Sequence, residues 1–429
     1  MSNGWDFDVA VVGGGPGGSS AATALARRGK RVLLLERARF PRFHIGESQL
    51  PWSNGVFRAL GVDQAIAEAG FVKKWGASFR PPGSIIEQYA DFEAAVETPM
   101  PQTFQVLRER FDEVLLHHSE RSGVSVRERH RFLDATFDAN AVTLRFEDSD
   151  RVEQTARVGV VVDASGRTGV LATRFGRHEY DPLLRNIAVH AQYEGIPRAE
   201  GRRAGDIRMF TRPDMGWLWL IPLSDTVTSV GAVIPKTVHQ REAEETAEGS
   251  LTHYLASTPP IESLLEHARR ISPARIDVDY SYLATQMAGD RWVAVGDAAA
   301  FLDPIFSTGV LLAMQAGLDA AQAIEAGLRT GDLSARAFAR YERILRKRYH
   351  HFRRFAIGFY EPAFRDLWFA PKKAFGIYGA IVSVLAGNWK PSRLTQAKIS
   401  LFFALVALRR LSRKIGPADA LTTAETSRS

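Results

Sequence analysis

Short apolar runs near the N-terminus predict a βαβ unit. Residues 6–12 contain a short β-branched run typical of a buried strand, residues 19–30 read as a helix of small side chains, and residues 31–36 read as a second strand. Several β-rich runs between residues 186 and 284 predict an antiparallel sheet, and the chain from Ser334 onward is helical and basic. The pattern therefore indicates an α/β fold, with a Rossmann-like nucleotide-binding domain, an inserted antiparallel sheet and a helical C-terminal region.

The turn between the first strand and the helix carries a dinucleotide-binding pattern. Gly13, Gly15 and Gly18 fit G-x-G-x-x-G, and Glu36 ends the second strand 23 residues after Gly13. Such a turn lets backbone N–H groups approach a pyrophosphate at the helix N-terminus, while the carboxylate binds ribose hydroxyls. We therefore predict that these four residues bind a dinucleotide cofactor.

Two later segments place an aspartate at the end of a strand. Residues 157–166 read as a strand that ends in Asp163-Ala164-Ser165-Gly166, and Gly296-Asp297-Ala298 lies between a strand and a helix. In the second segment, the carboxylate of Asp297 suits the hydroxyls of a sugar chain, and the backbone amides that follow it suit the edge of a flat ring. The alternative is an N-capping aspartate without a ligand.

The amino-acid composition excludes several classes of site and partner. The chain of 429 residues has no cysteine, which excludes disulfides, thiolate metal sites and a cysteine nucleophile. Its formal net charge of +7 is modest for this length and does not imply nucleic acid. Residues 1–12 show no basic leader, and the longest apolar runs, 375–387 and 399–408, are too short to span a bilayer. We expect a cytoplasmic protein without a transmembrane span or a bound metal.

The motifs together resemble the FAD-dependent enzymes that share the para-hydroxybenzoate hydroxylase fold. The match covers the glycine turn with Glu36, the helix start at Arg108, the Asp163 segment and the turn at Asp297. The resemblance implies FAD as the cofactor, with Arg108 near the flavin side chain and Asp297 near the ribityl and pyrophosphate groups. It adds further residues to the expected FAD-binding set, namely Gly296, Ala298, and Glu47 and Ser48 of the flavin-contacting segment 43–48.

Three features resemble the flavin-dependent halogenases in particular. The run from Trp217 to Pro222 matches W-x-W-x-I-P, and the run from Phe301 to Gly309 matches F-x-x-P-x-x-S-x-G. Lys74 precedes Trp75-Gly76, where that family has its essential lysine in a K-x-G setting. The resemblance implies that reduced FAD from a separate flavin reductase, O2 and chloride or bromide give hypohalous acid, which Lys74 presents to an aromatic substrate.

The residues that carry this resemblance also have structural explanations. Trp217 and Trp219 share one face of a strand, so they either fill the core or separate the flavin from the substrate. Geranylgeranyl reductases have a similar aromatic stretch. Lys74 is either a solvated surface lysine, like its neighbour Lys73, or a desolvated amine of lowered pKa that binds hypohalous acid.

The segment Phe306–Gly309 bears on the halide and on the substrate. Ser307 either caps a plain loop or, as the resemblance implies, belongs to a helix start whose amides at Thr308 and Gly309 hold a halide. Halogenases of free tryptophan have a glutamate where this chain has Phe306. The lack of that carboxylate base implies a phenolic or pyrrolic substrate, either free or tethered to a carrier protein.

Positive charge is concentrated near the C-terminus. Residues 336–354 hold eight Lys or Arg against one acid, Glu342, and form either a docking surface for an acidic carrier protein or a solvated helix face. Residues 390–414 read as an amphipathic helix that covers the substrate cavity, packs in a dimer or rests on a membrane surface. Its apolar positions include Leu401, Phe402, Leu405, Val406 and Leu408.

The sequence therefore predicts four parts and one function. The parts are a discontinuous FAD-binding domain, a substrate-side sheet, a helical cap and a disordered tail, at residues 1–185 with 286–345, 186–285, 346–416 and 417–429. The implied function is that of a flavin-dependent halogenase of secondary metabolism. The alternative is an FAD-dependent aromatic monooxygenase or a geranylgeranyl-reductase-like oxidoreductase on the same fold.

Overall fold

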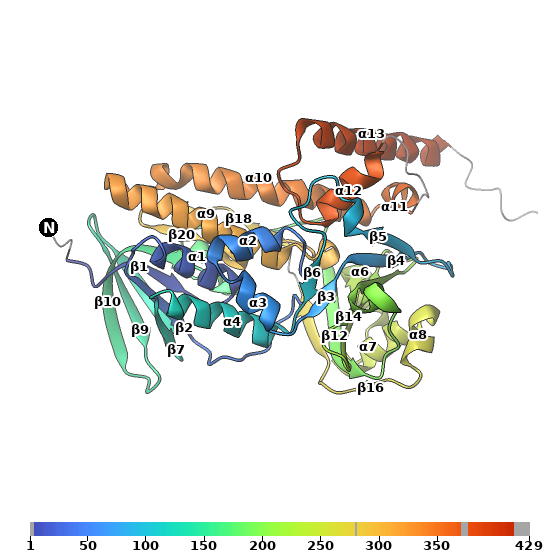
Figure 1. The fold of residues 1–429 in the computed structure, drawn as a ribbon, viewed down its shortest axis with the longest axis horizontal. Coiled ribbons are helices and arrows are strands. Elements are labelled where there is room, and N and C mark those ends of the chain that lie inside the picture. The colour runs from blue at the N-terminus through green and yellow to red at the C-terminus, as the bar shows by residue number, and fades with distance from the viewer. Residues whose placement is uncertain (1–3, 279–280, 370–375, 416–429) are drawn as a thin grey trace, which may run out of the picture.

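The protein has two large sheets at opposite ends of an elongated molecule. The structure is a computed structural model that describes residues 4–278, 281–369 and 376–415. Two long helices, α9 (Gly309–Thr330) and α10 (Ala335–Phe359), extend from the first sheet toward the second (Figure 1). The predicted tail 417–429 lies outside the described residues.

The first sheet is the predicted nucleotide-binding sheet. Its central strand β1 (Phe7–Val12) pairs in parallel with β2 (Val32–Glu36) and with β10 (Glu153–Asp163). Every residue of β2 is buried, because helices cover the faces of a parallel sheet. The remaining strands are β7 (Ser125–Glu128), β8 (Arg131–Phe137), β9 (Val142–Glu147), β19 (Ala288–Gly289) and β20 (Trp292–Ala294).

Helices α1 (Pro16–Ala26) and α9 pack closely against each other over this sheet. A Cβ atom at Gly317 would lie 2.6 Å from the carbonyl oxygen of Gly17, and a Cβ atom at Gly17 would lie 3.3 Å from that of Ala313. Only small side chains fit between the two helices, which explains the run of small residues in α1. The nearby α4 (Arg108–Arg121) follows β6 (Thr103–Gln105), as the sequence predicts.

The second sheet is largely the predicted antiparallel sheet. The strands β12 (Asn186–Glu194), β15 (Val227–Pro235), β14 (Trp217–Pro222) and β13 (Ile207–Thr211) are neighbours in that order. The sheet continues from β13 into two strands that the sequence analysis assigns to the FAD-binding part, β4 (Gly76–Arg80) and β5 (Gln88–Asp91). The boundary at residue 186 therefore does not separate the two sheets, since β13 and β4 are distant in the chain and no local pattern marks their parallel pairing.

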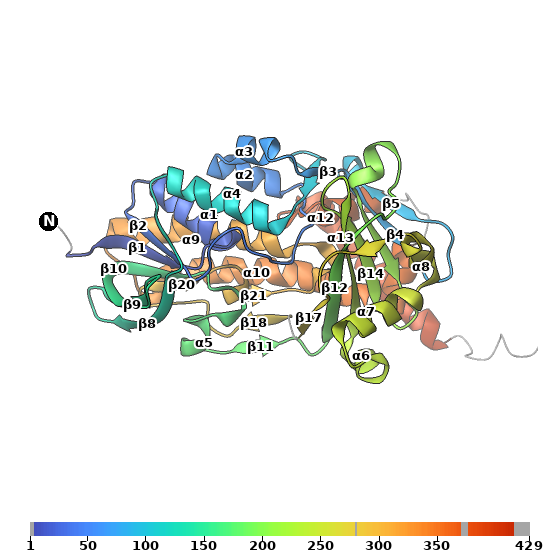
Figure 2. The same cartoon turned by 90° about the horizontal axis from the view of Figure 1, so that it is seen from below.

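Strand β14 divides its side chains between two apolar clusters. Trp217, Trp219 and Ile221 face a cluster shared with the C-terminal helices, whereas Leu218 and Leu220 face the opposite side. This alternation confirms the prediction that the two tryptophans share one face. The opposite side is covered by α7 (Ala247–Ala256), with α6 (Lys236–Glu242) and α8 (Pro259–Leu265) beside it (Figure 2).

The C-terminal helices cover the tryptophan side of the second sheet. They are α11 (Pro362–Trp368), α12 (Ile377–Leu385) and α13 (Arg393–Ile415), and α13 is the outermost of the three (Figure 1). None of the described helices is long and apolar enough to cross a membrane. The smaller elements include α2 (Ser53–Leu60), α3 (Asp63–Glu68), β3 (Val72–Lys74), α5 (Ala172–Phe175), β11 (His178–Tyr180), β16 (Arg269–Arg270), β17 (Arg275–Val278), β18 (Tyr282–Ala284) and β21 (Ala300–Phe301).

Candidate active site

The glycine turn after β1 packs so tightly against neighbouring backbone that it admits only glycine at two positions. Gly13 has φ +107°, and a Cβ atom there would lie 2.3 Å from the carbonyl oxygen of Ala164. A Cβ atom at Gly18 would lie 1.9 Å from the carbonyl oxygen of Gly13. Gly15 immediately precedes α1, whose first N–H groups have no partner within the helix and suit a pyrophosphate. The residues present therefore fit a dinucleotide cofactor.

Glu36 lies where the sequence places it, at the end of β2 beside the glycine turn. Its side chain is buried, and its two oxygens accept hydrogen bonds from the N–H of Gly14 at 2.7 Å and of Ala38 at 2.8 Å. These contacts fix the carboxylate next to the turn. Its binding of ribose hydroxyls stays a prediction.

Asp163 shapes the loop against which the glycine turn packs. Its buried carboxylate accepts hydrogen bonds from three backbone N–H groups, those of Ser165, Leu171 and Ala172. These bonds hold the start of the loop, including Ala164, against Gly13. Asp163 thus stabilises the loop that packs against the glycine turn, and its direct contact with FAD stays a prediction.

Arg108 ties the predicted flavin-contacting segment 43–48 to helix α4. Its Nε and Nη2 donate to the two oxygens of Asp112 at 2.8 and 3.0 Å, and its Nη1 donates to the carbonyl oxygen of Ile45. Burial raises the pKa of Asp297, in the Gly-Asp-Ala turn, to about 6, and the nearby positive charge of Arg108 opposes that rise. The structure therefore brings these distant predicted site residues together.

Glu47 links the same segment to the second sheet. Burial raises the pKa of the Glu47 carboxyl to about 7, while a hydrogen bond from Ser229 on β15 and the charge of Arg108 act against that rise. Ser229 also accepts a hydrogen bond from the indole N–H of Trp219 at 3.2 Å. A series of hydrogen bonds through Glu47, Ser229 and Trp219 thus links the expected flavin region to the aromatic face of β14.

The N-terminus of α9 has the features of an anion site. Ser307 adopts the left-handed conformation with φ +54°, and Thr308 is buried directly before the helix. Within the described residues, the Thr308 hydroxyl has no hydrogen-bond partner, and a Cβ atom at Gly309 would meet no atom within 4 Å. Free N–H groups at a helix start beside open space suit a halide, so the predicted role of Thr308 and Gly309 has a fitting geometry.

Lys74 is among the most buried polar side chains of the molecule. It is 1% exposed, and its Nζ donates to the Ser48 hydroxyl at 2.8 Å and to the Gln49 carbonyl oxygen at 3.0 Å. Burial lowers the pKa of Lys74 from 10.5 to about 7, against the attraction of Asp206. Its neighbour Lys73 is exposed, so the solvated-lysine alternative is wrong for Lys74 and fits Lys73 instead.

Lys74 lies at the edge of the aromatic cluster that contains the two tryptophans. Its Nζ is 5.2 Å from the ring centroid of Phe92, which packs in the same cluster as Trp217 and Trp219. The two indole rings are 5.8 Å apart and both are buried. Phe306 belongs to this cluster as well, with its ring 5.7 Å from that of Trp368.

Asp303 and Tyr360 were missed by the sequence analysis. The Asp303 carboxylate is 1% exposed and accepts hydrogen bonds from the Asn186 amide at 2.8 Å and the Tyr360 hydroxyl at 3.0 Å. Burial raises the pKa of Asp303 to about 6. The signal for Asp303 was present, since it is the one acid within an otherwise apolar motif that ends at Phe306, but nothing in the sequence marks Tyr360.

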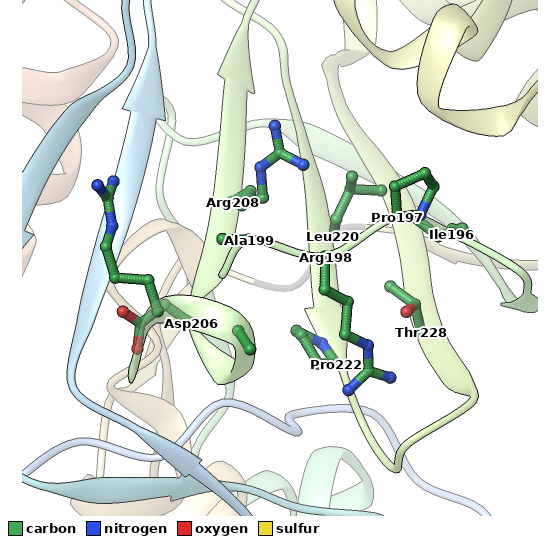
Figure 3. A pocket seen from close by; sticks show the side chains of 11 residues that line it. Ile196, Pro197, Arg198, Ala199, Asp206, Arg208, Leu220, Pro222 and Thr228 are labelled. Carbon is green, nitrogen blue, oxygen red and sulfur yellow. The ribbon is translucent and has the colours of Figure 1, made fainter. Parts of the chain in front are cut away.

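Asp206 was also missed, and it holds the backbone that follows Lys74. Its carboxylate accepts hydrogen bonds from the N–H groups of Trp75 at 2.6 Å and Gly76 at 3.0 Å. Figure 3 shows Asp206 at the rim of a hollow lined by Arg198, Arg208, Leu220 and Thr228. Leu220 projects from β14 on the side away from the two tryptophans, so this hollow is separate from the aromatic cluster.

Comparison with known proteins identifies the family. The model of the FAD binding domain family matches residues 6–355. The flavin-dependent halogenase armH1 of Armillaria mellea is 35% identical over 342 residues, which cover 75% of this chain and 65% of armH1. The 1H-pyrrole-2-carbonyl-(peptidyl-carrier protein) chlorinase of Pseudomonas fluorescens is 31% identical over 364 residues, which cover 80% of each protein. The chain belongs to the flavin-dependent halogenase family.

The fold of this halogenase-family chain agrees with that assignment. The myxobacterial chondrochloren halogenase CndH, described as a variant of the FAD-dependent halogenases, superposes with a TM-score of 0.78 at 35% identity. The match covers 94% of this chain and 90% of CndH. FAD is therefore the cofactor of this family member, and the cradle formed by Gly13, Gly15 and Gly18 fits it.

Proposed function

We propose that this protein is a halogenase that acts on an electron-rich aromatic ring. The observation that carries the proposal is the buried amine of Lys74, which is 1% exposed at the edge of the cluster containing Trp217 and Trp219. When bound, reduced FAD supplies with O2 the oxidising power that converts chloride or bromide to hypohalous acid. A separate flavin reductase provides the reduced FAD.

The chain's own residues hold and guide the reactants. Amides at Thr308 and Gly309 bind the halide, and the indoles of Trp217 and Trp219 separate the cofactor from the substrate. Lys74 donates a hydrogen bond to hypohalous acid and directs it at the ring. A pKa of about 7 leaves its amine partly neutral at physiological pH, and burial keeps competing water away.

The substrate is best explained as a phenolic or pyrrolic ring. Phe306 is surrounded by aromatic rings and supplies no base, so the ring must be reactive enough to be attacked without one. A relative named as a chlorinase of a carrier-bound pyrrole supports the pyrrolic choice and a tethered substrate.

An exposed basic stripe on α10 suits an acidic carrier protein. Arg336, Arg340, Arg343 and Lys347 are exposed, follow helical spacing, and form no salt bridge within the described part of the chain. Other cations of the basic run are engaged internally, as when Arg348 pairs with Asp319 beneath the surface. We therefore narrow the proposed carrier-docking surface to the four-residue stripe.

The test is a coupled assay with a flavin reductase, NADH, FAD, O2 and chloride or bromide, read by product mass. Lys74→Met should abolish halogenation of a phenolic or carrier-bound pyrrolyl substrate, and Lys73→Met is the matched control that should retain it. Equal halogenation by the two variants would refute the role of Lys74. A product that gains oxygen instead of halogen would favour the monooxygenase alternative.

A further inference from the structure

Helix α13 has a second apolar face that points away from the protein. Its inner face, with Ile399, Phe402 and Val406, is buried against the C-terminal cluster. On the outer face, four leucines are 43–67% exposed: Leu394, Leu401, Leu408 and Leu411. Leu405, 38% exposed, lies beside them. Contiguous exposed apolar surface of this kind marks an interaction site.

The outer face follows a heptad pattern. Leu394, Ala397, Leu401, Ala404, Leu408 and Leu411 are separated alternately by three and four residues, and both alanines are exposed. This spacing is typical of a helix that packs along a second helix, with each side chain inserted between residues of its partner. A lipid surface requires an apolar face but does not require this alternation.

We propose that the outer face of α13 pairs antiparallel with α13 of a second copy of this chain. A two-fold axis between residues 402 and 403 places Leu401 opposite the other copy's Ala404 and Ala397 opposite its Leu408. Each of the two end layers then pairs Leu394 of one copy with Leu411 of the other. A large side chain meets a small one in the four central layers, so the helices can approach closely, and the same surface serves both copies, as a two-fold dimer requires.

The charges near this face permit such a pairing. The same axis brings Ser400 level with the other copy's Leu405 and Lys398 level with its Ala407, so neither pair joins two charges. At the basic end of the helix, Arg409 and Arg413 donate to Asp366 of their own chain, and Arg410 donates to Glu361. These internal pairs reduce the repulsion between two helices that carry no acidic residue of their own.

The exposed area is large enough for a specific contact. The outer leucines and alanines of two copies would together bury on the order of 1,000 Å², which is the size at which specific interfaces begin. The proposal concerns assembly and does not depend on the halogenase reaction.

Sedimentation of the full chain over the micromolar range tests the proposal. We expect a concentration-dependent dimer, which Leu408→Glu should weaken at least about tenfold by placing a charge in the contact. The matched control is Leu183→Glu, because Leu183 is 62% exposed on another surface and Leu408 is 61% exposed. A monomer throughout the range, or equal dimerisation by both variants, overturns the proposal.

The absence of cysteine allows a test of the register. Ala397→Cys and Leu408→Cys copies, when mixed and oxidised, should form a disulfide-linked pair, because the proposed axis puts these positions opposite each other. Neither variant should cross-link alone, since identical positions are separated by about 16 Å along the helices. Self-linking of Ala397→Cys would indicate a parallel pair and overturn the proposal. Binding of the monomer to anionic vesicles, lost in Leu408→Glu, would instead assign the face to a membrane and overturn it too.

Discussion

The Tyr360 hydroxyl donates a hydrogen bond to the Asp303 carboxylate at 3.0 Å. The same hydroxyl accepts one from the indole N–H of Trp217 at 2.7 Å. Trp217 is otherwise packed among apolar side chains, so this polar chain fixes the orientation of its ring. Trp217 is one of the two tryptophans proposed to separate the cofactor from the substrate. Its ring is thus held in place through Asp303, a buried acid in the segment before α9.

Removal of the Tyr360 hydroxyl should measure this link. Tyr360→Phe leaves the Trp217 indole without its acceptor and Asp303 with one donor fewer, so it should lower the free energy of unfolding by about 1–3 kcal/mol. Urea unfolding followed by circular dichroism gives the value. Tyr180→Phe, at a tyrosine that is 55% exposed, should change it little. Equal effects of the two variants would show that the hydrogen bonds from Trp217 through Tyr360 to Asp303 contribute no stability.

Gly18→Ala should prevent FAD binding. The added methyl would lie 1.9 Å from the Gly13 carbonyl oxygen, so the turn must open and lose its fit to the pyrophosphate. FAD bound per chain, measured by absorbance after titration, should fall at least about tenfold. The control is Gly55→Ala in helix α2, where a Cβ atom meets nothing within 4 Å. Normal FAD content in Gly18→Ala would contradict the assigned cradle.

The lowered pKa of Lys74 predicts a pH-dependent stability. Between about pH 7 and its ordinary value of 10.5, the unfolded chain keeps a proton on Lys74 that the folded chain has released. Stability must therefore rise with pH in this window, by up to about 1.4 kcal/mol per pH unit from this group. The difference in unfolding free energy between the wild type and Lys74→Met isolates the contribution. A difference that is constant across the window would mean that Lys74 is not desolvated.

Charge reversal on α10 should separate carrier-bound from free substrates. Arg340→Glu with Arg343→Glu should raise KM for a carrier-bound substrate about tenfold, because an acidic partner would meet like charge. The kcat for that substrate and both constants for a free substrate should stay unchanged. Reversal of Arg202, a cation engaged with Asp91 and Glu93 at another site, offers a comparison. An equal rise in KM for both substrates would place the effect at the active site rather than at a docking surface.

Local patterns were sufficient for the nucleotide-binding half of the protein. The glycine turn, the small-residue helix and the buried strands each follow from neighbouring residues, and the structure has all of them. The shared face of Trp217 and Trp219 likewise followed from strand alternation. Such features depend on spacing within a few residues, which a sequence displays directly.

The remaining features depend on contacts between distant segments. The burial of Lys74 results from the pairing of β3 with β6 and from Ser48, and no local pattern distinguishes Lys74 from the exposed Lys73. Within the basic run of α10, Arg348 is buried, and its guanidinium lies 3.9 Å from the centroid of the Trp389 ring. In α13, inner and outer apolar residues follow one another along the helix, so the sequence pattern predicts a single apolar face. Only the fold shows that Phe402 is buried while its neighbour Leu401 is exposed.

The close approach of Gly17 to Gly317 has a consequence for how the two negatively charged reactants are held. The pyrophosphate is expected at the start of α1 and the halide at the start of α9, and these two helices approach each other closely at Gly17 and Gly317. A displacement of either helix is therefore transmitted directly to the other. With the pyrophosphate and the halide bound at these proposed positions, the distance between them would depend on this backbone contact, which no change of rotamer can relax.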